Sequence, residues 1–353
     1  MMTTYERMQR VLAHQEPDRV PIIDSAWAGT IRRWIREGMP EGMDWRDYFG
    51  VDKCETFSVD VSARYPSRVI EETDRYIIRT NEWGTTVKSF KELDATPQML
   101  DFKINDAKAW LEAKKRMDVT DDRIPWDWLK KYYDVCRKDG RWIRGVFWFG
   151  FDVTHSYMMG LETTLIGMME EPELIMDIFE TYLSHNEIMM QRIWDAGYHF
   201  DQILFYDDMG YKGTSFFSPE LYKAVLQPYH ERAVRWAHDH GITAELHSCG
   251  NIMTLIPEVV KTGVDVLNPM EVKAGMDPMK LKKEYGDRLT FHGGINAAHW
   301  KDKDVVLAEI EEKVPMLKEN GGYIFASDHS IPNDVSLENM KAIVEKAKQC
   351  GKY

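Results

Sequence analysis

Short apolar runs rich in Val, Ile, Leu and Phe alternate with amphipathic stretches along most of the chain. Such runs are typical of strands buried in a parallel sheet, and apolar residues repeated every three or four positions indicate helices between them. We expect strands at residues 20–24, 56–61, 143–150, 202–208, 243–250, 264–270, 289–295 and 323–329.

Helical patterns fill the intervals between these runs. Two helices are expected between residues 161 and 197, the second beginning near Pro172, and another begins after Ser218 and ends at Gly241. A β-hairpin that turns near Trp83 and Gly84 is expected over residues 75–90. The other expected helices lie at residues 4–14, 108–140, 252–262, 278–285, 304–320 and 336–348.

This alternation predicts an α/β protein with a parallel sheet. We favour a closed (β/α)8 TIM barrel over an open sheet because no Gly-x-Gly-x-x-Gly turn follows an early strand. One domain is expected over residues 1–353. Residues 1–140 would form a helical and hairpin elaboration, and residues 141–353 the regular β/α part.

Composition and charge exclude several classes of protein. With 44% hydrophobic and 29% charged residues the chain is an ordinary globular sequence, and its net charge of −13 argues against a nucleic-acid partner. It has neither a signal-peptide pattern nor an apolar stretch long enough to span a membrane. The four cysteines are widely spaced, which indicates no disulfide framework. We therefore expect a cytoplasmic protein without a membrane anchor.

Chemically active side chains gather at the ends of the predicted strands, where TIM barrels carry their active sites. Aromatic residues end the strand at 143–150, and Trp148, Phe149 and Phe151 could wall a substrate pocket or simply plug the barrel. The ends of the remaining strands hold Asp24, Asp207, Asp208, Glu245, His247, Cys249, Asn268, Glu271, His292, Asp328 and His329.

His247 and Cys249 are the strongest metal candidates. Side chains two positions apart on a strand share a face, so both could reach one zinc ion, which favours imidazole and thiolate ligands. A satisfied core histidine and a small buried cysteine are the alternative. The third ligand must come from another strand end, and we expect it to be His329, with His292 as a second candidate.

Two adjacent acids, Asp207 and Asp208, point to opposite sides of a strand, so one of them should face the barrel mouth. A capping role in a loop is the alternative. We count Asp207, Asp208, Glu271 and His292 as candidate catalytic residues. For substrate binding we count Trp148, Phe149, Phe151 and Asn268.

The sequence resembles the uroporphyrinogen decarboxylase superfamily. The resemblance rests on the Asp207-Asp-Met-Gly210 motif, Phe217-Ser-Pro-Glu-Leu-Tyr222, the Leu246-His-Ser-Cys-Gly-Asn251 motif and Gly293-Gly-Ile295. It implies a (β/α)8 barrel. True decarboxylases of the superfamily carry a motif of spaced arginines after the first strand, whereas this chain has only the adjacent Arg32 and Arg33 there.

The chain is more similar to the cobalamin-dependent methyltransferase branch, whose members bind zinc through His-x-Cys and a later Cys. His247 and Cys249 match the first two ligands, and His329 stands where the later Cys would be. The resemblance implies an enzyme that moves a methyl group between a small substrate and a cobalamin (corrinoid) on a corrinoid-binding partner protein.

One thiolate with two imidazoles would leave the zinc a stronger Lewis acid than two thiolates would, which favours a methyl ether as donor over methylation of a thiol. The aromatic residues Trp148, Phe149 and Phe151 favour an aryl methyl ether. A uroporphyrinogen-type decarboxylase (carboxy-lyase) and a non-catalytic corrinoid- or tetrapyrrole-binding barrel remain alternatives.

Overall fold

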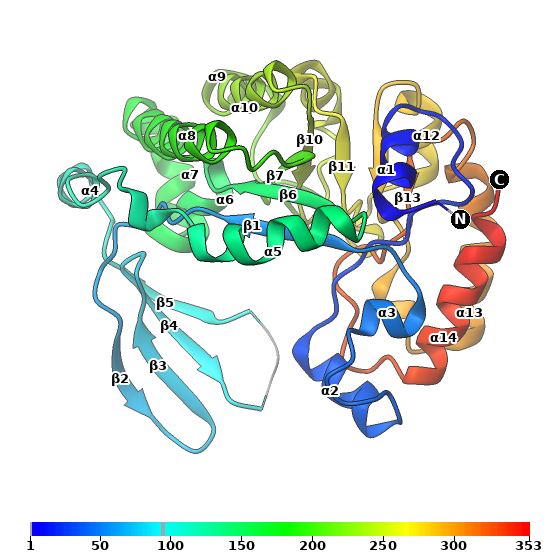
Figure 1. Cartoon of the computed structure of the whole chain (residues 1–353). Helices are drawn as coiled ribbons and strands as arrows, with labels where there is room; N and C mark the ends of the chain where they lie inside the picture. The colour runs from blue at the N-terminus through cyan, green and yellow to red at the C-terminus, as the bar shows by residue number, and fades with distance from the viewer. Residues whose placement is uncertain (1, 93–95) are drawn as a thin grey trace.

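The structure is a computed structural model that describes residues 2–92 and 96–353. Its main sheet consists of parallel strands in the order β1-β6-β7-β10-β11-β12-β13, with helices along its outer side (Figure 1). These strands are β1 (Cys54–Ser58), β6 (Trp142–Phe147), β7 (Gln202–Tyr206), β10 (Thr243–His247), β11 (Val266–Asn268), β12 (Thr290–His292) and β13 (Tyr323–Ile324).

The predicted TIM-barrel class is confirmed, but the first of the eight expected strands is not regular. Residues 20–24 lie between β13 and β1, where Ile22 forms a parallel bridge with Phe325 and its carbonyl accepts the Asp52 N–H at 3.0 Å. Pro21 has no N–H to donate, and the Asp24 carboxylate takes the Ser327 N–H at 2.6 Å. A side chain therefore supplies a contact that a regular strand would make with its backbone.

Most of the expected helices are present, but two are broken. The helix expected at residues 108–140 is two helices, Ala107–Lys114 and Trp126–Lys138, with a short turn at Asp121–Arg123 and Pro125 between them. The helix predicted from Ser218 to Gly241 is two helices, because Pro228 cannot donate a helical hydrogen bond and instead occupies the first turn of the second. The helices are α1 (Thr4–Leu12), α2 (Ala28–Arg36), α3 (Trp45–Phe49), α4 (Ala107–Lys114), α5 (Trp126–Lys138), α6 (Gly150–Asp152), α7 (Leu161–Glu170), α8 (Pro172–Asp195), α9 (Pro219–Val225), α10 (Gln227–Asp239), α11 (Ile256–Val259), α12 (Pro278–Tyr285), α13 (Lys303–Leu317) and α14 (Leu337–Cys350).

Shorter helical turns complete this set. They are η1 (Asp121–Arg123), the π-helix η2 (Val153–Met159), η3 (Val260–Thr262), η4 (Val272–Ala274) and η5 (Ala297–His299). Within the ranges that the structure describes, no helix is long and apolar enough to cross a membrane.

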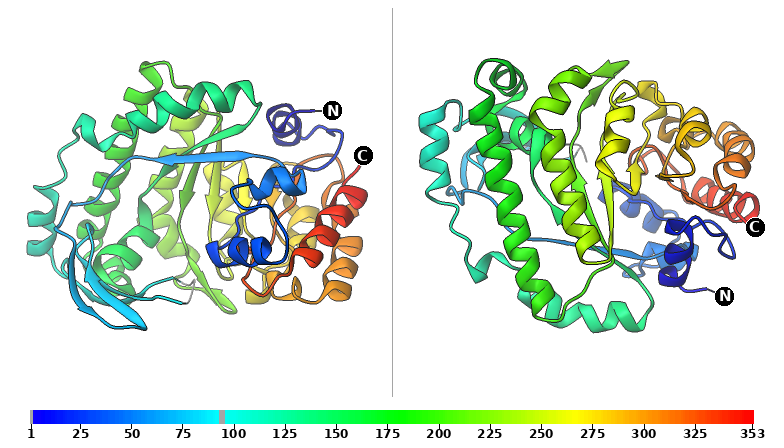
Figure 2. Two further views of the ribbon diagram at one scale, coloured as in Figure 1. Left: turned by 60° about the horizontal axis from the view of Figure 1, so that its bottom comes forward. Right: turned by 90° about the horizontal axis from the view of Figure 1, so that it is seen from above.

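A second, antiparallel sheet stands apart from the barrel sheet (Figure 2). The expected hairpin forms its centre and turns at Gly84, whose φ is +89°. Two flanking strands were not expected, since neither alternates buried and exposed residues. The four strands are β2 (Arg68–Glu72), β3 (Tyr76–Thr80), β4 (Thr85–Phe90) and β5 (Gln98–Phe102), and a small hairpin of β8 (Gly210–Tyr211) and β9 (Thr214–Ser215) lies elsewhere.

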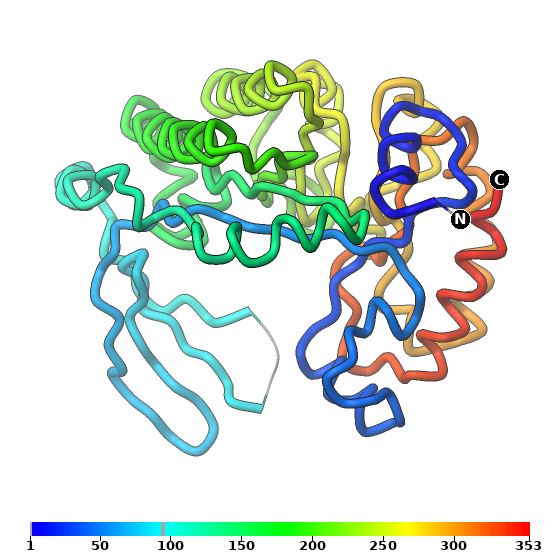
Figure 3. Tube along the Cα trace, in the orientation of Figure 1, coloured from blue at the N-terminus to red at the C-terminus, as the bar shows by residue number. Residues whose placement is uncertain are grey.

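Helix α1 packs at the end of the barrel where the strands begin. Its Met8 and Val11 are buried in a cluster with residues from four parts of the barrel, namely Ile23, Trp142, Val266 and Ile324. The two chain ends lie close together on this side (Figure 3), and Arg19 forms a bridge with Lys352. The opposite end, where the strands finish, is left for the functional site.

A buried carboxylate joins α1 to the irregular strand at residues 20–24. Asp52 accepts hydrogen bonds from Arg7 at 2.5 Å, from Arg19 at 2.7 Å and from the Ile22 N–H at 2.8 Å. Its side chain is only 1% exposed, so these partners replace water.

We predict that Asp52→Ala lowers the free energy of unfolding by about 3–5 kcal/mol, because it leaves the buried Arg7 and Arg19 without this counter-charge. Urea denaturation measures the change. Glu41→Ala, on an exposed loop, is the control and should cost less than about 0.5 kcal/mol. Equal stability of the two variants would contradict this account of Asp52.

Candidate metal and substrate site

A cavity of about 290 Å³ lies at the carboxyl ends of the barrel strands. Six of the residues predicted from the sequence line it: Asp208, His247, Cys249, Asn268, His292 and His329. The rest of its wall is formed by Ile23, Asp24, Ser25, Trp27, Arg144, Leu204, Tyr206, Ala326 and Ser330.

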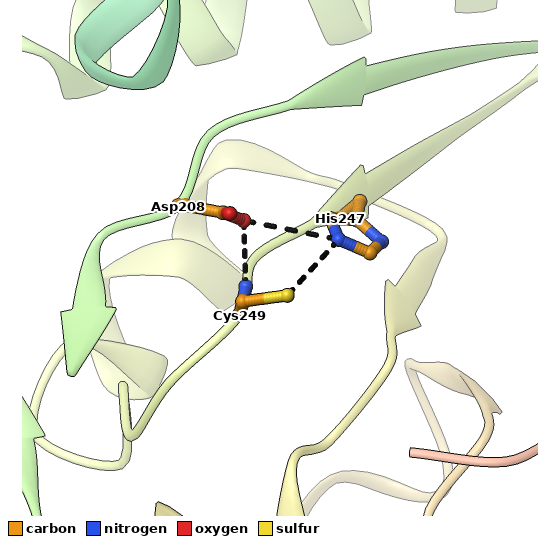
Figure 4. A group of neighbouring side chains, drawn as sticks. All are labelled: Asp208, His247 and Cys249. Atoms are coloured by element: carbon orange, nitrogen blue, oxygen red, sulfur yellow. Dashed lines mark hydrogen bonds and ion pairs between the residues drawn. The ribbon is translucent and has the colours of Figure 1, made fainter. Parts of the chain in front are cut away.

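Three potential metal ligands meet in this cavity (Figure 4). Asp208, His247 and Cys249 each offer one ligand atom, and these atoms all lie within 4.8 Å of one another. The Cys249 Sγ is 3.3 Å from the His247 Nε2, and the Asp208 Oδ1 is 3.8 Å from the same nitrogen. Strands β7 and β10 pair in parallel, so the segments that follow them emerge side by side. This pairing brings Asp208 next to Cys249, whose N–H it accepts at 2.8 Å.

Asn268 fixes which nitrogen of His247 is available. The Asn268 amide donates to the His292 carbonyl at 3.0 Å, so its oxygen faces the His247 Nδ1 and must accept a proton from it. The His247 Nε2 then carries the lone pair and points at Cys249 and Asp208. Hydrogen bonds of this kind orient metal-binding histidines and raise their basicity.

The electrostatics of Cys249 also fit a metal ligand. Burial raises the pKa of its thiol far above the usual range, and the charge of Asp208 raises it further. The free thiol is therefore protonated at neutral pH, and a cation would stabilise the thiolate. One imidazole nitrogen, one sulfur and one carboxylate oxygen within reach of one point form a donor set that zinc accepts.

His329 lines the same cavity but lies outside this ligand group. Its ring stacks on Trp27, with ring centroids 6.5 Å apart and planes at 23°. Burial lowers the pKa of its imidazole, which keeps the ring neutral. The role of His329 as the third ligand stays a prediction, whereas Asp208 already stands at ligand distance.

The two adjacent acids do point to opposite sides. Asp207 is fully buried away from the cavity, where it pairs with the His230 Nε2 at 2.8 Å and accepts the Asp152 N–H at 2.7 Å. Burial raises the pKa of Asp207, and the pairing with His230 opposes that shift. Gly150 passes so close that a Cβ there would lie 2.3 Å from the Asp207 carboxylate. Asp207, which follows β7, is thus hydrogen-bonded to the backbone of α6.

Three other candidates lie outside the cavity wall. Glu271 accepts the Gly250 N–H at 2.6 Å and so holds the turn after Cys249. Phe149 and Phe151 are buried in aromatic clusters, because the chain leaves β6 at Phe147 and turns at Gly150.

The third aromatic candidate, Trp148, stands just behind the wall. It stacks on the cavity residue Tyr206, with ring centroids 5.1 Å apart and planes at 16°. Trp148 therefore supports the wall from outside the cavity.

Among the cavity residues that were not predicted from the sequence, Arg144 and Tyr206 bear on the chemistry of the site. Arg144 lies inside the barrel on β6, and Tyr206 ends β7. The signal for Arg144 was a lone charge within an otherwise apolar strand, since such a charge must have a specific partner. Tyr206 had no signal, because a tyrosine fits any buried strand.

The fold and the site together describe a TIM-type barrel with a group of potential metal ligands at its rim. A family model described as uroporphyrinogen decarboxylase (URO-D) matches residues 149–350, and the chain belongs to this family. No curated protein matches the chain.

Among solved structures, a methyltransferase from Methanosarcina mazei is similar over 99% of each chain, with a TM-score of 0.68 and 16% identity. A psychrophilic family 10 endo-β-1,4-xylanase aligns over 65% of this chain and 84% of its own, with a TM-score of 0.41 and 12% identity. At these identities the likeness concerns the fold alone.

We predict that Gly150→Ala destabilises the protein more than Gly197→Ala. Both glycines have positive φ, +91° and +89°, so each substitution costs about 1–3 kcal/mol in backbone strain. Only at Gly150 does the new methyl group also collide with Asp207, which adds about 1–3 kcal/mol. Thermal and urea unfolding of both variants measure the difference, and equal losses would show that Asp207 does not pack as described.

Proposed function

We propose that the protein is a zinc-dependent methyltransferase that moves a methyl group between a small methylated substrate and a corrinoid on a partner protein. The observation that carries this proposal is the group of Asp208, His247 and Cys249 in a cavity at the barrel rim. Membership of the URO-D family is consistent with it, since that superfamily includes corrinoid methyltransferases.

The size and charge of the cavity favour methyl transfer over uroporphyrinogen decarboxylation. A cavity of about 290 Å³ lies at the lower limit of small-molecule sites, which suits a single substituted ring rather than a tetrapyrrole. Several carboxylate arms would need several arginines, and of the described cavity residues Arg144 alone is an arginine. Arg33 is occupied by Glu37 at 2.6 Å.

In the proposed reaction, residues of this chain would hold the metal ion that binds the reacting oxygen. His247, Cys249 and Asp208 would hold the zinc ion, with Asn268 keeping the His247 lone pair directed toward it. Bound zinc supplies Lewis acidity toward an oxygen of the substrate. In the proposed transfer the methyl group would leave that oxygen without the bonding electron pair, the reduced corrinoid would supply the pair for the new bond, and the oxygen would keep a negative charge that later takes a proton.

The ligand set favours the half-reaction at an oxygen donor. A single thiolate leaves the ion more electron-poor than two thiolates would, because a carboxylate or imidazole donates less charge than sulfur does. An electron-poor ion suits an ether oxygen as leaving group. We therefore place demethylation of a small methyl ether, such as an aryl methyl ether, ahead of thiol methylation.

We predict about one zinc per chain in the purified protein. Cys249→Ala and Asp208→Ala should lose most of it, and His329→Ala should keep it, because His329 lies outside the ligand group. Cys350→Ala, at the end of α14, is the matched cysteine control. Elemental analysis measures the metal, and circular dichroism verifies the fold. Zinc retained by Cys249→Ala, or lost from His329→Ala alone, would contradict this ligand set.

We also predict that the zinc-loaded protein demethylates small methoxylated aromatics with cob(I)alamin as acceptor. The appearance of methylcobalamin is followed by its absorbance, and a parallel assay supplies methylcobalamin with a panel of thiols. Ready thiol methylation without ether cleavage would contradict the inference that a zinc ion with one thiolate ligand favours an ether oxygen as leaving group. Stepwise decarboxylation of uroporphyrinogen, for which we expect no turnover, would instead place the protein with the decarboxylases.

A further inference from the structure

Beneath the group of potential metal ligands, Arg144 and His292 share one carboxylate inside the barrel. Glu245 is 1% exposed and accepts the Arg144 Nη1 at 3.0 Å, and its other oxygen lies 2.7 Å from the His292 Nδ1. The other nitrogen of His292 faces the Ile23 carbonyl at 2.9 Å. The single carboxylate of this layer is therefore shared between a guanidinium and an imidazole.

Arg144 uses only a small part of its hydrogen-bonding capacity. A guanidinium has five N–H donors, and the structure shows one of them on Glu245. The Nε is buried without an acceptor among the described residues, although buried donors are rarely left unpaired. Arg144 lines the cavity, so a molecule inside it can reach the free N–H groups.

Tyr206 places a second donor in the same cavity. It lines the wall from β7, the neighbour of β6, and within the described residues its hydroxyl has no hydrogen-bond partner. A phenol hydroxyl can donate a hydrogen bond, so Tyr206 offers the cavity a donor in addition to those of Arg144.

The acidic groups of the cavity are already engaged. The Asp24 carboxylate accepts the N–H groups of Ser25 and Ser327 at 2.7 and 2.6 Å. Asp208 accepts the Cys249 N–H and belongs to the metal group. Arg144 forms an ion pair with neither acid. An anionic ligand is thus the partner that this guanidinium lacks.

We propose that Arg144, with the Tyr206 hydroxyl, binds the carboxylate of a small aromatic acid whose other end reaches the metal cluster. Rings line the remaining wall, at Trp27, His247 and His329, and the cavity has room for one substituted ring. This inference rests on the proposed function in one respect, since it makes a methoxylated aromatic acid the methyl donor. Carboxylate binding itself requires neither zinc nor the corrinoid.

The test compares 4-methoxybenzoate with its uncharged amide, 4-methoxybenzamide, by isothermal titration calorimetry. Zinc-free wild-type protein should bind the acid at least about 10-fold more tightly than the amide, because a hydrogen bond to a charged group is stronger than a neutral one. Arg144→Met should weaken binding of the acid about 10- to 100-fold and leave the amide unchanged. Arg144→Lys should recover part of the loss.

Arg232→Met is the matched control. Arg232 pairs with Glu180 and Glu187 on the outside of the barrel, so its loss removes an equal charge without touching the cavity. If Arg144→Met does not fold, Tyr206→Phe still tests the proposal. This variant should weaken binding of the acid about 2- to 10-fold without removing a charge. Either of two results would overturn the proposal. The wild type would bind the acid and the amide equally, or Arg144→Met and Tyr206→Phe would both bind the acid as tightly as the wild type does.

Failure of this inference differs from failure of the proposed function. If neutral methoxyarenes donate methyl groups to cob(I)alamin but the acid does not bind, the carboxylate site is wrong and the methyltransferase stands. If the acid binds through Arg144 but neither it nor any neutral ether is demethylated, the carboxylate site stands and the methyltransferase is wrong.

Discussion

The carboxylate of Glu245 accepts hydrogen bonds from Arg144 and His292 inside the barrel, where water is excluded. Burial alone would raise its pKa, but the two positive partners outweigh burial and lower the pKa to about 2. Removing this carboxylate would leave the buried Arg144 guanidinium uncompensated under the site, a far larger penalty than losing one hydrogen bond. His292 in turn contacts the Ile23 carbonyl, so the Glu245 carboxylate on β10 is connected through β12 to the irregular strand at residues 20–24.

This charged layer separates two regions of different chemistry. Below it, Met8, Val11 and Trp142 form the apolar cluster that α1 closes. Above it, Asp208 and Cys249 face an open cavity. Parallel strands finish at one end of the sheet, so ligands from β7 and β10 meet there without any long loop. The barrel thus confines an apolar core to one end and polar chemistry to the other.

Repeating patterns were predictable, and contacts between distant segments were not. The strands at 202–208 and 243–250 were expected from apolar runs, and they carry Asp208, His247 and Cys249 to the rim. The choice of Asp208 rather than His329 at ligand distance depends on which loops lie side by side. The outer strands of the second sheet were not predicted, because an exposed strand such as β2 shows no alternation to recognise.

The sequence by itself determined the barrel class, the rim position of His247 and Cys249, and the family, since burial periodicity and short motifs are local properties. Only the tertiary structure decided that Asp207 turns into the core with His230, that Phe149 and Phe151 leave the cavity, and that Arg144 keeps free donors inside it. These outcomes follow from the positive φ of Gly150 and from the register of β6, β7 and β10. Both are set by contacts between residues far apart in the chain, which no local pattern records.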